Sequence, residues 1–240
     1  MSRPMDLDGC DLPEDRLYDV EESTWVLCPD GGAPWTLGLI STLVSFAGRV
    51  QSLTFRPEAG ELARGRSVAT VESIRYTGPV RIPVDGTVLE RNEALLGRPK
   101  LLNDDPYGRG WVVRFRPRLP APRPAHLESA AAVADRLRAR IHALRIRCYP
   151  AAPDVELIEV GTECAATLAR LDEELAGRAP EDVLLLVSDD PTSPIELIRW
   201  ADRTGHTLLA HRTEGRLHHF LVRKEANPVP KRRSVASGRI

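Results

Sequence analysis

Cys164 is the residue of this 240-residue sequence whose type and position most clearly suggest chemistry. It precedes a run from Ala165 to about Ala176 that has the apolar spacing of a helix. A thiol at a helix start receives the partial positive charge of unpaired backbone N–H groups, which favours the nucleophilic thiolate. The adjacent carboxylate of Glu163 opposes ionisation, so we expect Glu163 to modulate the thiol. Two interpretations stay open for Cys164: a reactive thiol, or a small residue packed at a helix start.

The other three cysteines lie far apart and form no C-x-x-C pair. This spacing predicts neither a zinc site nor a disulfide framework, so any cysteine chemistry is expected from single thiols. Cys10 falls in an acidic N-terminal stretch that we expect to be unstructured. Cys28 follows an apolar strand and is assigned to the core. Cys148 ends a helix near the boundary between the two halves, where it could face Cys164.

No other pattern in the chain predicts an active site. His218 and His219 are adjacent in a predicted strand, so they point to opposite faces and cannot form one two-histidine site; no metal site is expected. The sequence has no glycine-rich phosphate loop and no nucleophile and base at convincing spacing. Whether the protein is an enzyme stays open, with a carrier of the sulfurtransferase type as the most that is expected.

A second stretch of interest is VESIRYTGPVRIPVDG from Val71 to Gly86, two β-branched runs around a turn with Arg75 near its tip. A guanidinium stays charged and its nitrogens are delocalised, so Arg75 cannot be acylated as a lysine amine can. The whole chain has only three lysines, Lys100, Lys224 and Lys231.

The elements around these residues fall into two halves. Short strands and turns between Thr24 and Arg116 predict a mostly β domain. A proline-rich stretch, Arg116 to His126, reads as a linker. It leads into an amphipathic helix, with Val133 and Leu137 on its apolar face, that either caps the first domain or bridges the two.

The remainder alternates strand and helix in the order β-α-β-α-β-β, which predicts a small two-layer α/β sandwich. Ser193 is expected to cap the second helix, with Pro194 in its first turn and Glu196 completing a capping box. The expected organisation is a disordered N-terminus (1–16), a β domain (17–117), a linker and helix (118–150), the α/β domain (151–225) and a disordered basic tail (226–240).

Composition narrows the partners. The net charge of −1, with 42% hydrophobic and 28% charged residues, is typical of a globular protein and argues against nucleic acid as a partner. The N-terminus lacks the apolar core of a signal peptide, and the longest apolar-leaning run, residues 35–48, is too short to cross a bilayer. We therefore expect a cytoplasmic protein with no membrane partner.

Residues 17 to about 147 resemble the H protein of the glycine cleavage system, a lipoyl-bearing hammerhead fold. The resemblance is carried by LYDVEESTWV, VESIRYTGPVRIPVDGTVLERNEAL and LLNDDPYGRGWVVRFRP. In that family an E-S-V-K hairpin presents a lysine for lipoate; here Glu72 and Ser73 match, and Arg75 falls on the lysine position. The resemblance thus implies a degenerate lipoyl site without lipoate. Either the hairpin drifted after lipoylation was lost, or its cationic tip docks where the arm once did.

Residues 155–224 resemble the TusA/SirA family of sulfur carriers. The matching features are the element order, Gly161-x-x-Cys164, the acidic turn Asp189-Asp190-Pro191 and the closing hairpin HTLLAHRTEGRLHHFLVRK. The resemblance implies that Cys164 carries a persulfide without metal or cofactor. The family's Cys-Pro-x-Pro sequence is absent, since Ala165 and Thr167 stand at the proline positions.

Together these patterns predict an α+β protein of two domains, a β-rich lipoyl-like domain followed by a small α/β sandwich. The leading hypothesis is a sulfur-relay protein that uses Cys164, exchanges sulfur with donor and acceptor proteins, and docks lipoate-system enzymes through its first domain. The alternative is a non-catalytic adaptor or regulator of a lipoate-dependent complex, in which both sites are lost.

Overall fold

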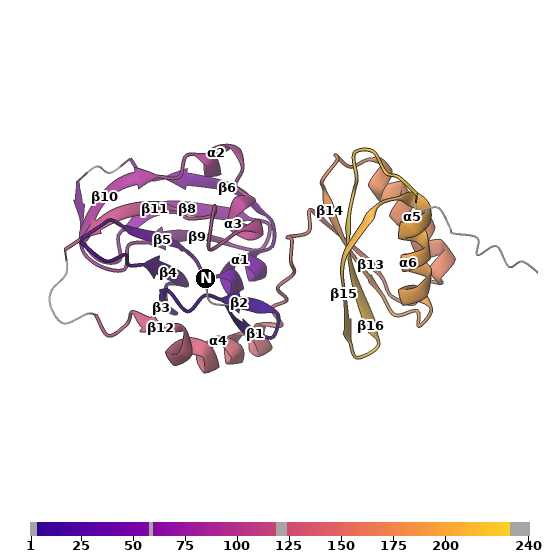
Figure 1. Ribbon diagram of the computed structural model, residues 1–240, viewed down its shortest axis with the longest axis horizontal. Helices are drawn as coiled ribbons and strands as arrows, with labels where there is room; N and C mark the ends of the chain where they lie inside the picture. Colours follow the sequence, from indigo (N-terminus) through magenta and orange to yellow (C-terminus); the bar gives the residue numbers. More distant parts are fainter. Residues whose placement is uncertain (1–3, 58–59, 119–123, 231–240) are drawn as a thin grey trace, which may run out of the picture. The chain divides into compact units, whose positions relative to one another are not determined.

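The computed structural model describes residues 4–57, 60–118 and 124–230. The chain divides into two compact units, residues 1–152 and 153–240, each with its own core (Figure 1). In the described part of the chain, no helix is long and apolar enough to span a bilayer.

The first unit is built from three sheets and four helices within its described residues. A seven-stranded sheet has the spatial order β12 (Glu128–Ser129), β3 (Leu17–Asp19), β4 (Thr24–Leu27), β5 (Trp35–Leu39), β11 (Val113–Pro117), β10 (Gly86–Arg91) and β7 (Glu61–Leu62). The three-stranded sheet is β6 (Val50–Phe55), β8 (Ser67–Ser73) and β9 (Thr77–Arg81). The remaining elements are the hairpin β1 (Met5–Leu7) and β2 (Cys10–Leu12), and the helices α1 (Ser41–Ala47), α2 (Ala94–Gly97), α3 (Leu101–Asp104) and α4 (Ala130–Leu144).

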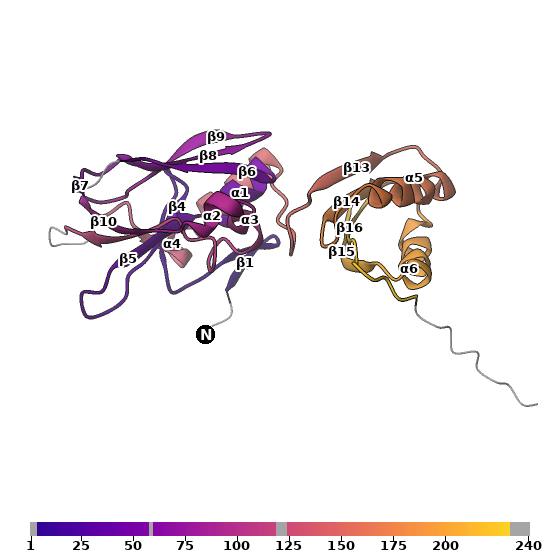
Figure 2. The same cartoon turned by 90° about the horizontal axis from the view of Figure 1, so that it is seen from above.

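The core of this unit lies between the two larger sheets, which Figure 2 shows as separate layers. Alternate residues of β8 point inward, so that Val71 is buried while its neighbour Glu72 is exposed. Leu37 of β5 and Phe115 of β11 are fully buried from the opposite layer. Val71 of β8 and Val80 of β9 belong to this core, so the β8–β9 hairpin packs against it through one face.

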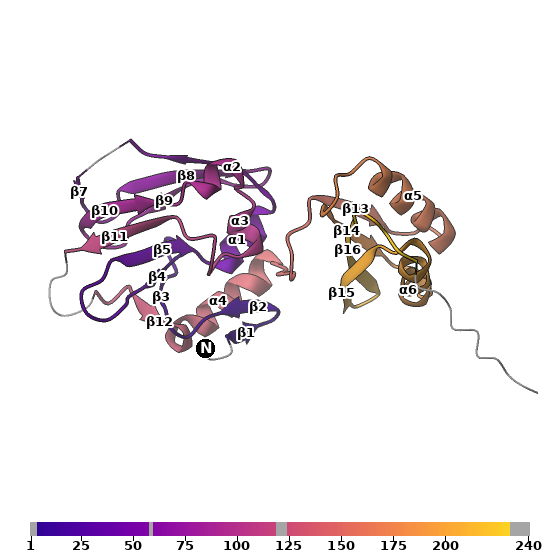
Figure 3. The ribbon, with the colours of Figure 1, turned by 45° about the horizontal axis from the view of Figure 1, so that its top comes forward.

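Helix α4 packs on the first unit. Val133, Leu137 and Ile141 share one face of the helix and are buried in a cluster with Tyr18 and Trp25. Figure 3 shows α4 beside the β1–β2 hairpin and β12. Of the two expected placements of this helix, the structure therefore has the one in which it caps the first domain. Part of the predicted linker, residues 119–123, lies outside the described residues.

The N-terminal segment is ordered from residue 4 onward, so the predicted disorder of residues 1–16 is wrong for its described part. Leu7, Cys10 and Leu12 are each 1% exposed and lie in the same cluster as α4. The turn that joins their strands uses positive φ angles at Asp8 and Gly9, which both residue types tolerate. The apolar pattern is only three residues long on each strand, which is too short to stand out in an acidic sequence.

Cys10 is also bonded to Cys148, with the two Cα atoms 5.0 Å apart and a sequence separation of 138 positions. This pair contradicts the prediction that the cysteines act as single thiols without a disulfide framework. The spacing gave no hint, because the partners come from opposite ends of the unit. Cys28 and Cys164 are not part of a disulfide.

The second unit is a four-stranded sheet with two helices. Its spatial order is β13 (Val155–Glu159), β14 (Val183–Ser188), β16 (Leu217–Arg223) and β15 (Thr207–Glu214), with β13 and β14 parallel and the other pairs antiparallel. Helices α5 (Cys164–Ala176) and α6 (Ser193–Thr204) follow the two parallel strands and cover one face of the sheet (Figure 1). Both helices therefore begin at the same edge of the sheet, where β13 and β14 end. The last ten residues of the predicted basic tail, 231–240, lie outside the described residues.

Candidate functional site

Cys164 is the first residue of α5, and Glu163 is the N-cap without a side-chain hydrogen bond to the helix. The backbone N–H of Cys164 donates instead to Asp190 Oδ2 at 2.9 Å. The predicted position at a helix start is therefore present, and the capping carboxylate comes from the turn after β14.

Asp190 caps both helices of this unit. Its Oδ1 accepts hydrogen bonds from the backbone N–H and the hydroxyl of Thr192, both at 2.7 Å. These bonds hold the pKa of the Asp190 carboxyl below its usual value. Since Thr192 is the N-cap of α6, one anionic side chain joins the starts of α5 and α6.

This arrangement corrects the expected cap of α6. Ser193 is the first helical residue, not the N-cap, and its hydroxyl makes no capping bond. Asp190 satisfies the backbone at the helix start, which leaves the Ser193 hydroxyl without that role. The capping-box pattern therefore identified the right region and the wrong residue.

The pKa of the Cys164 thiol is raised above its usual value. Burial is the largest cause, the charge of Asp190 is the next, and the charge of Glu196 adds a smaller effect in the same direction. A hydrogen bond from the Thr192 side chain acts in the opposite direction. The carboxylates that raise the pKa of this thiol therefore belong to the 189–196 segment, whereas we expected this effect from Glu163.

A layer of buried polar residues lies at the same edge of the sheet. Glu159 ends β13 and Ser188 ends β14, and both belong to the set of residues that faces the helices. Thr167 of α5 and Ser193 of α6 start the buried stripes of their helices. All four are at most 2% exposed, so polar groups replace the apolar core just where Cys164 begins its helix.

Two histidines, His211 on β15 and His218 on β16, lie on the last two strands of the same sheet. His211 Nε2 lies 3.3 Å from His218 Nδ1, and the hydroxyl of Thr213 lies 3.2 Å from the same His218 atom. His218 also contributes to the lowered pKa of Asp190. The partner of His218 is thus His211 on the neighbouring strand, while His219 is buried in the next position. Among the described residues, no three His, Cys, Asp or Glu side chains are arranged to hold a metal ion.

The second predicted site, in the first unit, is the turn between β8 and β9. Ser73 organises it: its hydroxyl donates to the Ala47 carbonyl at 2.8 Å and accepts the backbone N–H of Tyr76 at 3.0 Å. Ile74 at the turn is 82% exposed, and Arg75 follows it, also exposed. Glu72 accepts a hydrogen bond from the Ser52 hydroxyl at 2.9 Å. The three residues assigned to the degenerate lipoyl site thus lie on one exposed hairpin.

The side chain of Tyr76 packs against Gly78 next to the hairpin tip. A Cβ placed on Gly78 would lie 2.1 Å from the Tyr76 hydroxyl oxygen, so the tyrosine side chain lies directly against Gly78. Burial raises the pKa of Tyr76. Lys100 is the single lysine of this unit and lies in the N-cap of α3, with its Nζ 4.0 Å from Asp104. No described lysine stands on the hairpin.

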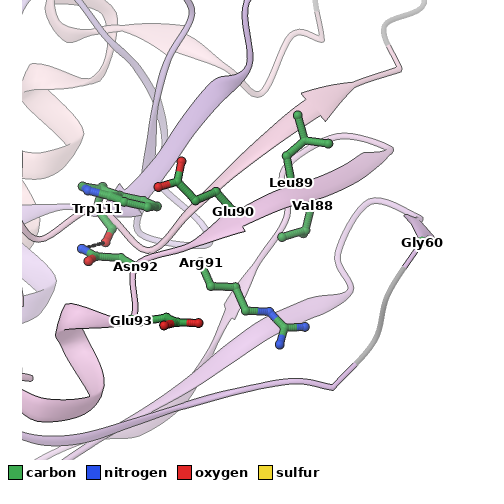
Figure 4. Close-up of a pocket in the computed structure, with 8 residues that line it drawn as sticks. All are labelled: Gly60, Val88, Leu89, Glu90, Arg91, Asn92, Glu93 and Trp111. Carbon is green, nitrogen blue, oxygen red and sulfur yellow. Dashed lines mark hydrogen bonds between the residues drawn. The ribbon is translucent and has the colours of Figure 1, made fainter.

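A surface groove of about 680 Å³ runs along β10 in the first unit, and no sequence pattern predicted it. Figure 4 shows Glu90, Arg91 and Glu93 around it, with Asn92 Nδ2 donating to the Trp111 carbonyl at 2.7 Å. Its lining contains charged and apolar side chains but no cysteine, histidine or lysine. The groove therefore does not offer the chemistry expected of either predicted site.

Comparison with known proteins gives two family matches. The glycine cleavage H-protein model matches residues 16–139, and the sulfurtransferase TusA model matches residues 159–224. The predicted resemblances of both halves, and the predicted α+β fold class, are confirmed.

Individual relatives agree with the first of these matches. Glycine cleavage system H protein 5 of Aquifex aeolicus is 36% identical over 145 residues, which is 60% of this chain and 98% of that protein. The H protein of Thermus thermophilus is 37% identical over 109 residues, 45% of this chain and 82% of that protein. The crystal structure of an H protein from Mycobacterium marinum is 25% identical, covers 52% of this chain and 98% of its own, and has a TM-score of 0.47.

Proposed function

The chain belongs to the glycine cleavage H-protein family through its first unit, and its second unit matches the sulfurtransferase TusA model. From this combination we propose that the protein carries sulfur as a persulfide on Cys164 of the TusA-like unit. The observation that carries this proposal is the position of Cys164, a free thiol at the start of α5. There the first backbone N–H groups of the helix favour negative charge on sulfur.

The chemistry is exchange at sulfur. The Cys164 thiolate attacks the outer sulfur of a donor persulfide R–S–SH, the donor S–S bond breaks, and R–S⁻ leaves with the proton that the Cys164 thiol has lost. The products are Cys164–S–SH and R–SH, so no net oxidation occurs and no metal is needed. An acceptor thiolate then removes the outer sulfur in the same way. The partners are a sulfur donor protein and a sulfur acceptor protein, in the cytoplasm.

The first unit keeps the carrier fold for docking and does not carry lipoate. The hairpin tip does not fit a lipoyl group, because Arg75 offers a charged, delocalised guanidinium where an amine would be needed. Enzymes that recognise lipoyl-type domains are the partner class that this unit would meet.

The second candidate function is a non-catalytic adaptor of a lipoate-dependent complex. The raised pKa of Cys164 favours it, because a thiol that stays protonated near pH 7 is a weak nucleophile. In this case neither Cys164 nor Arg75 carries a group.

The test is the intact mass of the full chain before and after incubation with a persulfide donor. We expect the wild type to gain one sulfur, Cys164→Ser to gain none, and Cys28→Ser, which removes the other cysteine outside the disulfide, to gain one. If the wild type gains no sulfur under conditions that load an ordinary TusA protein, the carrier function is wrong and the adaptor remains.

A further inference from the structure

Two buried hydroxyls lie at the helix starts that surround Cys164. Thr167 is 1% exposed and Ser193 is 2% exposed, and neither hydroxyl oxygen has a hydrogen-bond partner within the described residues. A buried hydroxyl without a partner costs folding free energy, so a pair of them at one edge calls for a physical reason.

The geometry of the helices directs these groups toward the Cys164 end. Thr167 is three residues after Cys164, hence on the same helix face, and side chains in a helix point back toward its N-terminus. Ser193 occupies the first turn of α6, which starts at the same sheet edge and is joined to α5 through Asp190. Both hydroxyls are therefore placed at the same end of the sheet as the Cys164 thiol, one from each helix.

The charges near Cys164 make such donors necessary. Asp190 and Glu196 both oppose negative charge on the thiol. A hydropersulfide is more acidic than a thiol, so its outer sulfur is an anion near pH 7 and needs hydrogen-bond donors in a site with two nearby carboxylates. Hydroxyl groups can donate to such an anion, and the starts of α5 and α6 add their partial positive charge.

We propose that the hydroxyls of Thr167 and Ser193 form the subsite that binds the outer sulfur of a persulfide on Cys164. The proposal rests on the carrier function above and names the residues that bind the outer sulfur atom. In the empty protein the two hydroxyls lack a partner; in the loaded protein the sulfur anion accepts from them. The site thus favours the loaded cysteine over the empty thiolate.

The experiment uses the full chain loaded with inorganic polysulfide, freed of excess reagent and treated with cyanide. Cyanide attacks the outer sulfur, the S–S bond breaks, and thiocyanate and the Cys164 thiolate are formed, so thiocyanate reports the release rate. We expect Thr167→Val and Ser193→Ala each to release thiocyanate about tenfold faster than the wild type, the effect of one hydrogen bond to a charged group. Thr167→Ser keeps a hydroxyl and restores the slow rate.

The matched control is Thr204→Val, which removes a hydroxyl at the far end of α6 that is bonded to the Trp200 carbonyl, and it should release sulfur at the wild-type rate. Where Thr167→Val does not fold, Ser193→Ala carries the same expectation. Equal release rates in wild type, Thr167→Val and Ser193→Ala, with the wild type fully loaded, would overturn the subsite and assign the hydroxyls to buried water. A wild type that never loads would instead overturn the carrier function itself.

Discussion

Asp190 is the residue that links the ionisation of Cys164 to the fold. It caps α5, is held anionic by Thr192, and raises the pKa of the thiol that it caps. The same bond that orders the helix start therefore restrains the nucleophile. In this chain, which lacks the prolines that flank the family's cysteine, Asp190 both caps the start of α5 and raises the pKa of Cys164.

We predict that Asp190→Asn lowers the pKa of Cys164, because it removes the second-largest cause of the shift and leaves burial in place. The alkylation rate of Cys164 by iodoacetamide at pH 7 should rise about threefold, and the pH profile should move to lower pH. Glu196→Gln removes a smaller contribution and should give a smaller change. An unaltered pH profile in Asp190→Asn would contradict the assigned role.

At the hairpin tip, the prediction concerns lipoylation. The wild type should gain no mass from lipoate and a lipoate–protein ligase, whereas Arg75→Lys, which restores a primary amine at the tip, should gain one lipoyl group. The matched control is Arg81→Lys, which places a lysine on β9 away from the tip and should stay unmodified. Lipoylation of the wild type would show that another group serves as carrier.

The positions of Cys164 at a helix start and of Arg75 at a hairpin turn could be predicted from the sequence, but their surroundings could not. Cys164 was visible because a thiol before a helical pattern is a local feature. Asp190 lies 26 positions away, and only the parallel pairing of β13 with β14 brings it to Cys164. Thr167 and Ser193 were noted in the sequence for other reasons, and their lack of a hydrogen-bond partner could not be predicted because it depends on packing.

At the scale of elements, the Cys10–Cys148 disulfide ties the N-terminal hairpin to the segment after α4. We predict that Cys148→Ser lowers the free energy of unfolding of the first unit by about 2–5 kcal/mol, because the long loop closed by this bond gains freedom in the unfolded chain. Urea unfolding followed by tryptophan fluorescence measures the change, and Trp25 reports from the same cluster as Cys10. A reducing agent should shift the wild type to the same midpoint and leave Cys148→Ser unchanged. An identical midpoint for oxidised and reduced wild type would show that the bond does not form.

A second element-scale prediction concerns the junction of α6 and β15. Burial, and then Lys224, lower the pKa of His206 below its usual value of 6.5, while its Nδ1 accepts the backbone N–H of Glu225 at 3.2 Å. The unfolded chain therefore binds the proton more readily, so the stabilisation is complete above about pH 6.5 and is lost as the pH falls below it.

The free energy of unfolding should accordingly decrease between pH 7 and pH 5, as measured by urea midpoints. His206→Gln cannot titrate, so its midpoint should depend less steeply on pH. His211, whose pKa is lowered by burial and by His218, contributes in the same direction and leaves a residual slope. A wild-type slope that His206→Gln does not reduce would contradict the assignment.

The helices and strands of the second unit were predictable because their apolar periods are regular over five or more residues. The N-terminal hairpin was missed because three-residue strands carry too little pattern. The N-cap of α6 was predicted at Ser193 because serine is a common capping residue. The N-cap is Thr192 instead, and its backbone N–H is bound by the carboxylate of Asp190 in the preceding turn.

On the scale of the whole molecule, the chain combines an H-protein family unit with a TusA-like unit. Two domains of different families were predictable because each keeps motifs with fixed order and spacing. The function of the two domains together cannot be deduced from the motifs of either one, since a fold alone does not determine a function. In the proposed function, the two positions that determine it are Arg75 and Cys164.

The most direct measurement is therefore a peptide mass map of the protein isolated from cells whose thiols are alkylated at lysis. One digest reports both positions. The account predicts that the peptide containing Cys164 carries one additional sulfur in a measurable fraction of molecules, and that the hairpin peptide around Arg75 carries no lipoyl group. A Cys164 peptide that is always a simple thiol, even after cells are supplied with a sulfur donor, would contradict the central claim that this protein carries sulfur.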